Sequence, residues 1–561
     1  MAVTTTKKGK TFRIYKIFVI AISLAIVAFI LNIAPNYIRK EITDKINLVI
    51  NNSNVTKSLK SDIIIENNVV YISQDDVKNF FDDNIYYDTK YNQMVTTSDT
   101  KVAVLPINNK EIKVNGSNVN IFAGLINKNS KYYLPFSEIS KSVYNVETEY
   151  IEDSNTVILT SLDRELVYAN ASKNCGIKWK PTMFSKNVDK VKRGDNLTVV
   201  PSKDKTEWTK VTTALGKVGY IKTSNLVNEQ KVRDDFKLDK QIDGKVSIAW
   251  DYFSYHAYAP TRTGRIKGVN VVSPSFFALA EQGQGAITQN IGNSGIDYIN
   301  WAHRNGHKVW PILSNDSLKD TTSEILKDYK YRETLINNIV QLTIDYNLDG
   351  INLDFENVYQ ADKDNYSKLV IELAPRLREL GKVLSVDVTA PDGSEDWSLC
   401  FDRHVIGKVA DYIVFMAYDQ HGKSSSEAGS VAAYDWVEKN INKFLKQEEV
   451  DSSKIILGIP FYTRIWKGSG TNLTSEVVSM KNTYQCIPEG TKVTWLEDEK
   501  QNFVKYLKDN VECKIWIEDN QSIKEKLKLI SQYNLAGAGY WEKDREDPTI
   551  WDSISTSLDI K

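Results

Sequence analysis

The sequence predicts a multidomain chain whose last part is a (β/α)8 TIM barrel. A chain of 561 residues exceeds one ordinary domain, so several domains are expected. From residue 244 to 561 an apolar strand followed by a stretch of helical period recurs eight times, which is the pattern of an eight-stranded barrel. Upstream of residue 244 the chain carries short β-rich runs separated by turn residues, which indicates smaller domains before the barrel.

Charge and cysteine content argue against several classes of function. The 71 Lys and Arg residues nearly cancel the 72 Asp and Glu residues, so no basic field predicts nucleic-acid binding. The four cysteines form no CxxC pair, and we expect no metal site and no cofactor. Cys486 and Cys513 could pair outside the cell, but their spacing does not establish that they reach each other.

Residues 17–34 form an apolar run at the N-terminus. Only Ser23 and Asn32 in it are polar, and as a helix it would span about 27 Å, close to the hydrocarbon core of a bilayer. Five Lys and Arg residues lie in the preceding segment 1–16. They predict a cytoplasmic tail, a single transmembrane anchor in the cell membrane and everything downstream on the outer face. A cleaved signal peptide is the alternative, although the run lacks an A-x-A site and ends at Pro35.

Residues 60–165 contain an internal repeat with an offset of about 62 residues. Residues 69–98 and 131–161 each show a Tyr-containing strand, a short helix, a second strand, a turn and a Val/Thr strand. Between the copies, "KVNGSNV" is a strong hairpin signal. The segment resembles the α+β module at the N-terminus of copper amine oxidases, which implies a spacer or wall-adhesion role. It contains no histidine, so we expect no copper chemistry.

Residues 172–228 predict a small all-β domain, because short strands alternate with regular turns and end in "GKVGYIKTSNL". The segment resembles the bacterial Src-homology-3-like domain, which implies a small barrel of a kind that often binds peptidoglycan peptide. We expect Trp208 and Tyr220 to lie in its core. The charged residues 229–243 are predicted to be a linker.

The barrel is predicted to fill residues 244–561. Its eight candidate strands are 245–253, 268–279, 307–315, 349–356, 383–391, 411–419, 454–462 and 537–544. The longer gap between the seventh and eighth strands, about 467–519, predicts a small α+β insertion beside the barrel mouth.

Acidic and aromatic residues gather at the carboxyl ends of these strands, where barrel enzymes carry their chemistry. They are Asp354, Glu356, Tyr418, Asp419 and Trp541. Alternation along the fourth strand, "DGINLDFE", turns Asn352, Asp354 and Glu356 to one face. Asp349, followed by Gly350, is expected to be a structural residue that enters this strand.

"DGINLDFE" resembles the DGxDxDxE signature of glycoside hydrolase family 18, the chitinase-like barrels. "MAYD" on the sixth strand and Trp541 on the eighth extend the likeness. "LGIPFYTRIW" and "YWEKDREDP" most resemble the peptidoglycan-directed members of that family, related to spore cortex-lytic N-acetylglucosaminidases.

The resemblance implies a role for each residue. In a substrate-assisted reaction the 2-acetamido oxygen attacks, so one protein acid suffices. Glu356 would be the general acid and then the general base, with a pKa raised by burial and a neighbouring carboxylate. Asp354 would accept the acetamide N–H, and Tyr418 would orient the acetamido oxygen.

The remaining candidate residues would bind sugar. Asp419 would contact a hydroxyl group, and Trp541 would form the apolar floor under the distorted ring. The family has Asp where this chain has Asn352. We expect this amide to hydrogen-bond Asp354, to let Asp354 ionise more readily and to alter the pH optimum.

These expectations describe a monomeric, membrane-anchored glycosidase that cleaves β-linked N-acetylglucosamine bonds in peptidoglycan. A chitinase or chito-oligosaccharide hydrolase is one alternative. A lectin-like cell-wall binder that has lost turnover is the other, and the intact Glu356 argues against it. Internal or terminal cleavage and a requirement for muramic lactam stay open.

Overall fold

The computed structural model describes residues 22–23, 45–201, 206–235, 241–253 and 258–561. Apart from Ile22 and Ser23, the predicted tail and membrane anchor lie outside these residues. Among the helices of the described ranges, none combines the length and apolar character needed to cross a bilayer. The chain forms two compact units, one mainly of residues up to Leu238 and one mainly of Asp239–Lys561.

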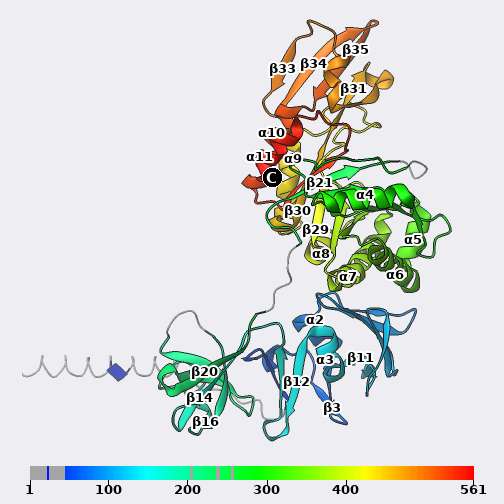
Figure 1. Ribbon diagram of the computed structural model, residues 1–561. Helices are drawn as coiled ribbons and strands as arrows, with labels where there is room; N and C mark the ends of the chain where they lie inside the picture. Colours follow the sequence, from blue (N-terminus) through cyan, green and yellow to red (C-terminus); the bar gives the residue numbers. More distant parts are fainter. Residues whose placement is uncertain (1–21, 24–44, 202–205, 236–240, 254–257) are drawn as a thin grey trace, which may run out of the picture. The chain divides into compact units, whose positions relative to one another are not determined.

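The first unit contains the predicted repeat (Figure 1). One copy is β4 (Val69–Ser73), α2 (Gln74–Phe80), β5 (Tyr86–Asp88) and β6 (Gln93–Thr97); the other is β11 (Lys131–Pro135), α3 (Phe136–Tyr144), β12 (Val146–Ile151) and β13 (Thr156–Ser161). The first strands of the copies start 62 residues apart, at 69 and 131, and they pair antiparallel with each other.

Further strands complete this part of the first unit. They are β1 (Asn47–Ile50), β2 (Ser53–Asn54), β3 (Ile64–Glu66), β7 (Val102–Pro106), β8 (Glu111–Val114), β9 (Ser117–Asn120) and β10 (Ile126–Lys128). The predicted hairpin joins β8 to β9. Its turn residues, Asn115 and Gly116, both have positive φ, which is why Asn-Gly suits this turn.

The rest of the first unit is all-β. Its single sheet contains β14 (Leu166–Ala171), β15 (Cys175–Lys178), β16 (Asn187–Val191), β17 (Asn196–Val199), β18 (Trp208–Thr212), β19 (Val218–Lys222) and β20 (Leu226–Arg233). The domain exceeds the predicted range 172–228 on both sides, because β14 precedes it and β20 continues past it. Trp208 and Tyr220 are only half-buried, so their predicted place in the core is wrong. Alternation turns Val211 and Ile221 inward instead.

The second unit is the predicted barrel. Its strands are β21 (Val246–Asp251), β22 (Val271–Pro274) with β23 (Phe277–Leu279), β25 (Lys308–Val309) with β26 (Ile312–Ser314), β27 (Gly350–Asp354), β28 (Val383–Val388), β29 (Tyr412–Met416), β30 (Ile455–Pro460) and β36 (Gly537–Trp541). The second and third strands are each broken in two, and β24 (Ile287–Gln289) pairs with β23. β36 pairs in parallel with both β30 and β21, which closes the ring. All eight predicted strands are therefore confirmed.

Helices surround the strands of this barrel (Figure 1). They are α4 (Gly292–Arg304), α5 (Lys319–Lys327), α6 (Tyr329–Asp345), α7 (Lys363–Glu379), α8 (Arg403–Val409), α9 (Tyr434–Lys446), α10 (Asn520–Gln532) and α11 (Ile550–Leu558). The main core lies between the two layers. Leu353 and Phe355 from the fourth strand belong to it, together with Leu369 and Leu373 from α7.

The insertion between β30 and α10 is a five-stranded antiparallel sheet. Its strands are β31 (Tyr462–Lys467), β32 (Thr474–Ser479), β33 (Val493–Leu496), β34 (Gln501–Lys508) and β35 (Val511–Ile517). Between residues 462 and 517 the structure contains 3₁₀ turns but no α-helix, so the predicted α+β character is wrong. Cys486 and Cys513 are free thiols that pack in the same small core.

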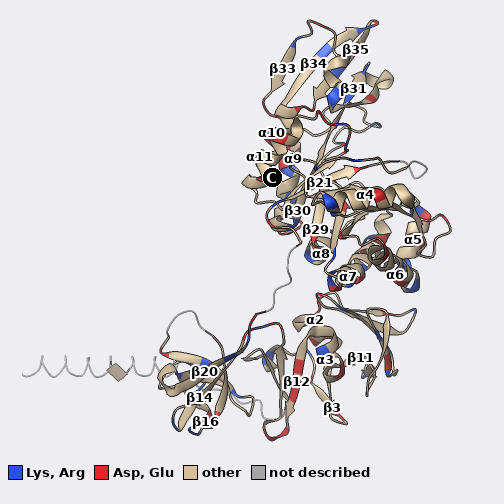
Figure 2. Cartoon of the chain, viewed as in Figure 1, with Lys and Arg blue, Asp and Glu red and all other residues tan. Residues whose placement is uncertain are grey.

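Acidic and basic residues are interspersed over the ribbons of both units (Figure 2). This distribution agrees with the nearly equal numbers of the two kinds of charge.

Candidate active site

The fourth strand directs its polar residues into the barrel. Asn352 is fully buried, whereas its neighbours Ile351 and Leu353 pack outward into the main core. Asp354 ends the strand on the same face as Asn352. The acids of this strand therefore point toward the barrel mouth, as predicted.

Glu356 follows the strand end and is fixed through its backbone. Its N–H donates a 3.0 Å hydrogen bond to the side-chain oxygen of Asn315, and its carbonyl accepts a 2.8 Å bond from the amide of the same residue. Asn315 is buried at the end of β26. Two bonds from one buried side chain hold Glu356 at the mouth.

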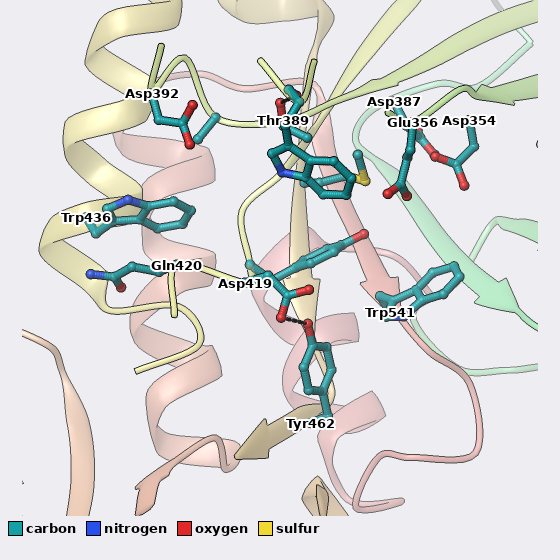
Figure 3. Close-up of a pocket in the computed structure, with 14 residues that line it drawn as sticks. Asp354, Glu356, Asp387, Thr389, Asp392, Asp419, Gln420, Trp436, Tyr462 and Trp541 are labelled. Carbon is teal, nitrogen blue, oxygen red and sulfur yellow. Dashed lines mark hydrogen bonds between the residues drawn. The ribbon is translucent and has the colours of Figure 1, made fainter. Parts of the chain in front are cut away.

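A pocket lies at this end of the barrel (Figure 3). Its lining residues are Asp354, Glu356, Asp387, Thr389, Ala390, Asp392, Trp397, Met416, Tyr418, Asp419, Gln420, Trp436, Tyr462 and Trp541. Five of these fourteen are carboxylic acids, and none is Lys or Arg. Five of the six predicted site residues lie here together, and Asn352 is the exception.

Three of these carboxyl groups have strongly raised pKa values. Burial, followed by the charges of Asp354 and Asp419, raises the pKa of Glu356 from 4.5 to about 8. Burial and the charge of Asp387 raise the pKa of Asp354 from 3.8 to about 8. Burial raises the pKa of Asp387 well above its ordinary value, and a hydrogen bond from Asn352 opposes that shift. The three groups are thus coupled and resist ionising together.

Asp354 and Glu356 also hydrogen-bond to each other. The bond raises the pKa of Glu356 and lowers that of Asp354, so Glu356 donates the proton and Asp354 accepts it. The second oxygen of Asp354, Oδ1, is buried and has no hydrogen-bond partner among the described residues. The site therefore combines a protonated acid with a free acceptor atom.

Tyr418 and Asp419 follow the sixth strand. Burial raises the pKa of Tyr418 well above its ordinary value, so the phenol keeps its proton. Gly458 on β30 makes room for it, since a Cβ there would come within 3.2 Å of the ring. Asp419 accepts a 2.8 Å hydrogen bond from Tyr462, which is drawn in Figure 3. The pair couples the barrel to the first strand of the insertion.

Aromatic rings border the pocket. Trp541 ends the eighth strand and packs against Trp250 and Tyr252, with ring centroids 6.0 and 5.7 Å apart. Trp397 is 41% exposed, and Trp436 lies across the pocket from Trp541 (Figure 3). Flat apolar surfaces of this kind suit the faces of sugar rings.

Asn352 does not interact with Asp354 as we expected. Its hydrogen-bond partners are Trp250, Ser273, Ser385 and Asp387. The expected easier ionisation of Asp354 is also wrong, because Asp387 supplies the like charge that we had thought absent. Asn352 lies beneath the pocket and reaches it only through these neighbours.

Asp349 and His421 lie outside the residues that line the pocket. Oδ2 of Asp349 accepts a hydrogen bond from the backbone N–H of Val309 and lies 2.9 Å from a ring nitrogen of His303, and Oδ1 accepts one from Lys308. It therefore anchors the start of the fourth strand. His421 is hydrogen-bonded to the Ser430 carbonyl and is not a lining residue.

Sequence reasoning missed Asp387, Trp397, Trp436, Tyr462 and Asn315. A signal existed for Asp387, since "VLSVDV" places one acid in an apolar strand in phase with Ser385. Trp397 and Trp436 come from a loop and a helix start, where no strand period identifies a direction.

Comparisons with known proteins agree with this geometry. Residues 249–546 match the family described as glycosyl hydrolases family 18. The uncharacterized glycosylase YvbX of Bacillus subtilis is 26% identical over 312 residues, which cover 54% of this chain and 85% of that protein. The cortical fragment-lytic enzyme of Bacillus anthracis is 24% identical over 239 residues, which cover 41% of this chain and 55% of that protein.

Solved structures are also similar to this chain. A chitinase from Chromobacterium violaceum matches with a TM-score of 0.49 and 24% identity, covering 56% of this chain and all of that one. The spore cortex-lytic enzyme SleL of Bacillus cereus matches with a TM-score of 0.49 and 20% identity, covering 62% of this chain and 79% of that one.

Proposed function

The chain belongs to glycosyl hydrolases family 18 and is a glycosidase, and from that premise we propose that it cleaves β-linked N-acetylglucosamine bonds in peptidoglycan. The proposed mechanism is retaining and substrate-assisted. The observation that carries it is the pairing of protonated Glu356 with Asp354, whose buried Oδ1 has no partner among the described residues. A 2-acetamido group offers the N–H that such an acceptor requires.

The reaction needs two steps. In the first, Glu356 gives its proton to the leaving glycosidic oxygen as the C1–O bond breaks, and the acetamido oxygen forms a bond to C1. Asp354 accepts the acetamide N–H and offsets the positive charge of the oxazolinium ion. In the second step Glu356 takes a proton from water and the water oxygen bonds to C1, while the bond between C1 and the acetamido oxygen breaks. The oxazolinium ring thus opens, and the original configuration at C1 is retained.

The surrounding residues support this assignment. The Tyr418 phenol keeps its proton, so it can donate to the acetamido oxygen and hold that oxygen in line with C1. Trp541 offers an apolar face beside the carboxyl groups (Figure 3). Asp419 remains the candidate for a sugar hydroxyl contact.

The charge of the pocket favours N-acetylglucosamine over muramic acid at the reacting position. Its ionisable lining consists of five carboxyl groups and two phenols, with no Lys or Arg among the lining residues. A free muramic acid residue carries a lactyl carboxylate, which would bring a further negative charge to carboxyl groups that already resist ionising together. N-acetylglucosamine is neutral and fits the same field.

Peptidoglycan as the polymer rests on two kinds of support. Relatives of the barrel include proteins named cortical fragment-lytic enzymes, and residues 60–165 and 172–228 resemble modules of bacterial surface proteins. Chitin is the alternative polymer, because its repeating unit presents the same neutral acetamido sugar.

We further propose that the protein is a monomer held in the cell membrane, with the barrel on the outer face. The support is the apolar run at 17–34 and the basic segment 1–16 before it. The two upstream modules would then hold the enzyme against the wall.

Digestion of purified peptidoglycan and of chitin by the full-length protein tests the proposal. We expect new reducing ends from peptidoglycan that terminate in N-acetylglucosamine by mass spectrometry, and at least about a hundredfold slower release with Glu356→Gln. Release of reducing ends from chitin alone would make chitin the substrate in place of peptidoglycan. Binding without release by the unmutated protein would favour the lectin-like alternative. A β-configured initial product, followed by NMR, is expected for retention.

A further inference from the structure

The amide of Asn352 is held in one orientation. The indole nitrogen of Trp250 lies 2.7 Å from its side-chain oxygen, and an indole N–H can only donate. The amide oxygen must therefore face Trp250, and the amide nitrogen must face the other way. That nitrogen lies 2.7 Å from Oδ1 of Asp387 and 3.1 Å from the Ser385 hydroxyl.

This orientation gives Asp387 a fixed place in the site. β27 and β28 pair in parallel with Asn352 opposite Ser385 and Leu353 opposite Val386. Continuing this register by one residue brings Asp354 level with Asp387, and alternation turns both toward the barrel interior. Asp387 is 3% exposed and lines the pocket.

We propose that Asp387 is a positioning residue that keeps the proton on Glu356, by presenting a buried carboxyl group to Asp354 from the neighbouring strand. The inference rests on the proposed function of Glu356 as the acid. Asn352 supports this role of Asp387, because its amide nitrogen donates a hydrogen bond to the Asp387 carboxyl group. The amide on the fourth strand and the carboxyl group on the fifth thus act as one unit.

The groups around Asp387 support this role. Asp354 and Glu356 come from the fourth strand, Tyr418 comes from the sixth, and Tyr366 comes from α7. Each is an acid or a phenol, and no cation contributes to the pKa shift of Asp387. Carboxyl groups gathered in such a space cannot all ionise, so each makes its neighbours retain protons. The raised pKa of Asp354, in which Asp387 is the largest cause after burial, agrees with this.

The test is an exchange of the two side chains in the full-length protein. Asp387→Asn removes the carboxyl group of residue 387. Asn352→Asp instead adds a second carboxyl group, in the place of an amide nitrogen that lies 2.7 Å from Oδ1 of Asp387. The double variant Asn352→Asp with Asp387→Asn restores one amide and one carboxyl group in reversed order. It remains compatible with Trp250, because a carboxylate also accepts from the indole N–H.

Activity is measured as kcat/KM against pH on an unsubstituted N-acetylglucosamine hexamer, because an aryl leaving group would lessen the need for the acid. For Asp387→Asn we expect the basic limb to move down by about one pH unit, so that kcat/KM falls about fivefold at pH 8 and about ninefold at pH 9. At pH 9 the double variant should recover to within about twofold of the kcat/KM of the unmutated enzyme. Ser385→Ala, which removes another partner of Asn352 without changing charge, should leave the limb in place.

Two results would overturn the inference: an unmoved limb in Asp387→Asn, or a double variant no more active than either single variant. A protein that cleaves no glycan would instead refute the proposed function. In that case ¹³C NMR titration of the Glu356 carboxyl group, assigned with Glu356→Gln, still tests the inference. A lower Glu356 pKa in Asp387→Asn supports it, and an unchanged pKa contradicts it.

Discussion

The carboxyl groups of Glu356 and Asp354 share a hydrogen bond in which Glu356 is the donor. Burial and two neighbouring carboxylates raise the pKa of Glu356 to about 8, so the acid is protonated at neutral pH. We expect kcat/KM to fall above about pH 8, where Glu356 loses this proton. The measurement is a pH–rate profile on an unsubstituted acetamido oligosaccharide.

Glu356→Gln is the matched variant for this prediction. An amide keeps the shape of the side chain but cannot supply a proton, so we expect kcat to fall by about 10² to 10⁴-fold. The residual rate should show no basic limb near pH 8. A limb that persists in this variant would assign the titration to another group.

The same burial predicts how stability depends on pH. Because the folded-state pKa of Glu356 is raised, its contribution to stability is fully present below the unfolded-state value of 4.5 and is lost as pH rises through about 8. Each pH unit between the two values corresponds to about 1.4 kcal/mol. Glu356→Gln should therefore gain thermal stability over the unmutated protein between about pH 4.5 and 8. The exposed Glu395→Gln is the control, and equal gains in both variants would refute this origin.

Asp419 acts on Glu356 through its charge, whereas Tyr462 touches Asp419 through a hydrogen bond. Asp419→Asn should shift the basic limb of kcat/KM to lower pH, because one negative charge beside Glu356 is removed. Tyr462→Phe removes a hydrogen bond and no charge. It should lower kcat/KM about fivefold, for a loss of about 1 kcal/mol, without moving the limb. Identical limbs in both variants would contradict the electrostatic role of Asp419.

Sequence reasoning succeeded where one strand carried the information. The alternation in "DGINLDFE" was enough to turn Asp354 inward and to leave Leu353 for the core. The chemistry also depends on Asp387, which comes from another strand. Its place beside Asp354 is set by a register between β27 and β28, and no pattern within either strand specifies that register.

The hydrogen-bond partner of Asn352 also could not be predicted from its own strand. From sequence alone its nearest acid is Asp354, two residues away on one face. The structure directs its amide nitrogen to Asp387 instead, because the Trp250 indole already occupies the oxygen. Trp250 itself fits only because Gly539 has no Cβ, which would lie 2.7 Å from the ring. The orientation of the Asn352 side chain therefore depends on contacts among the first, fourth, fifth and eighth strands of the barrel.

Trp397 offers an exposed aromatic face at the pocket, 41% exposed. It is not among the residues assigned to proton transfer or to the acetamido group, so we expect it to contribute binding energy equally before and during reaction. We expect Trp397→Ala to raise KM about five- to thirtyfold, for 1 to 2 kcal/mol, with kcat little changed. Phe184→Ala, at a ring 93% exposed in the first unit, controls for loss of an exposed aromatic group. A fall in kcat with unchanged KM would contradict this role.

Lys526 and Glu518 form a buried ion pair where the insertion returns to the barrel. The ammonium lies 2.9 and 3.1 Å from the two carboxylate oxygens, and the side chains are 1% and 0% exposed. Ser522 and Gln501 also donate to the carboxylate. The pair therefore sits in a hydrogen-bonded network that is closed to bulk solvent.

Removing only the cation should be costly, because an uncompensated charge would stay buried. We expect Lys526→Met to lower the free energy of unfolding by about 3 to 5 kcal/mol at neutral pH. The loss should shrink as pH falls, because burial already raises the pKa of Glu518 and protonation removes the unpaired charge. Lys526→Met with Glu518→Gln should regain most of the stability, since a neutral amide needs no counter-ion. Differential scanning calorimetry across pH makes the comparison, and a double variant as unstable as Lys526→Met would show that packing, not charge, dominates.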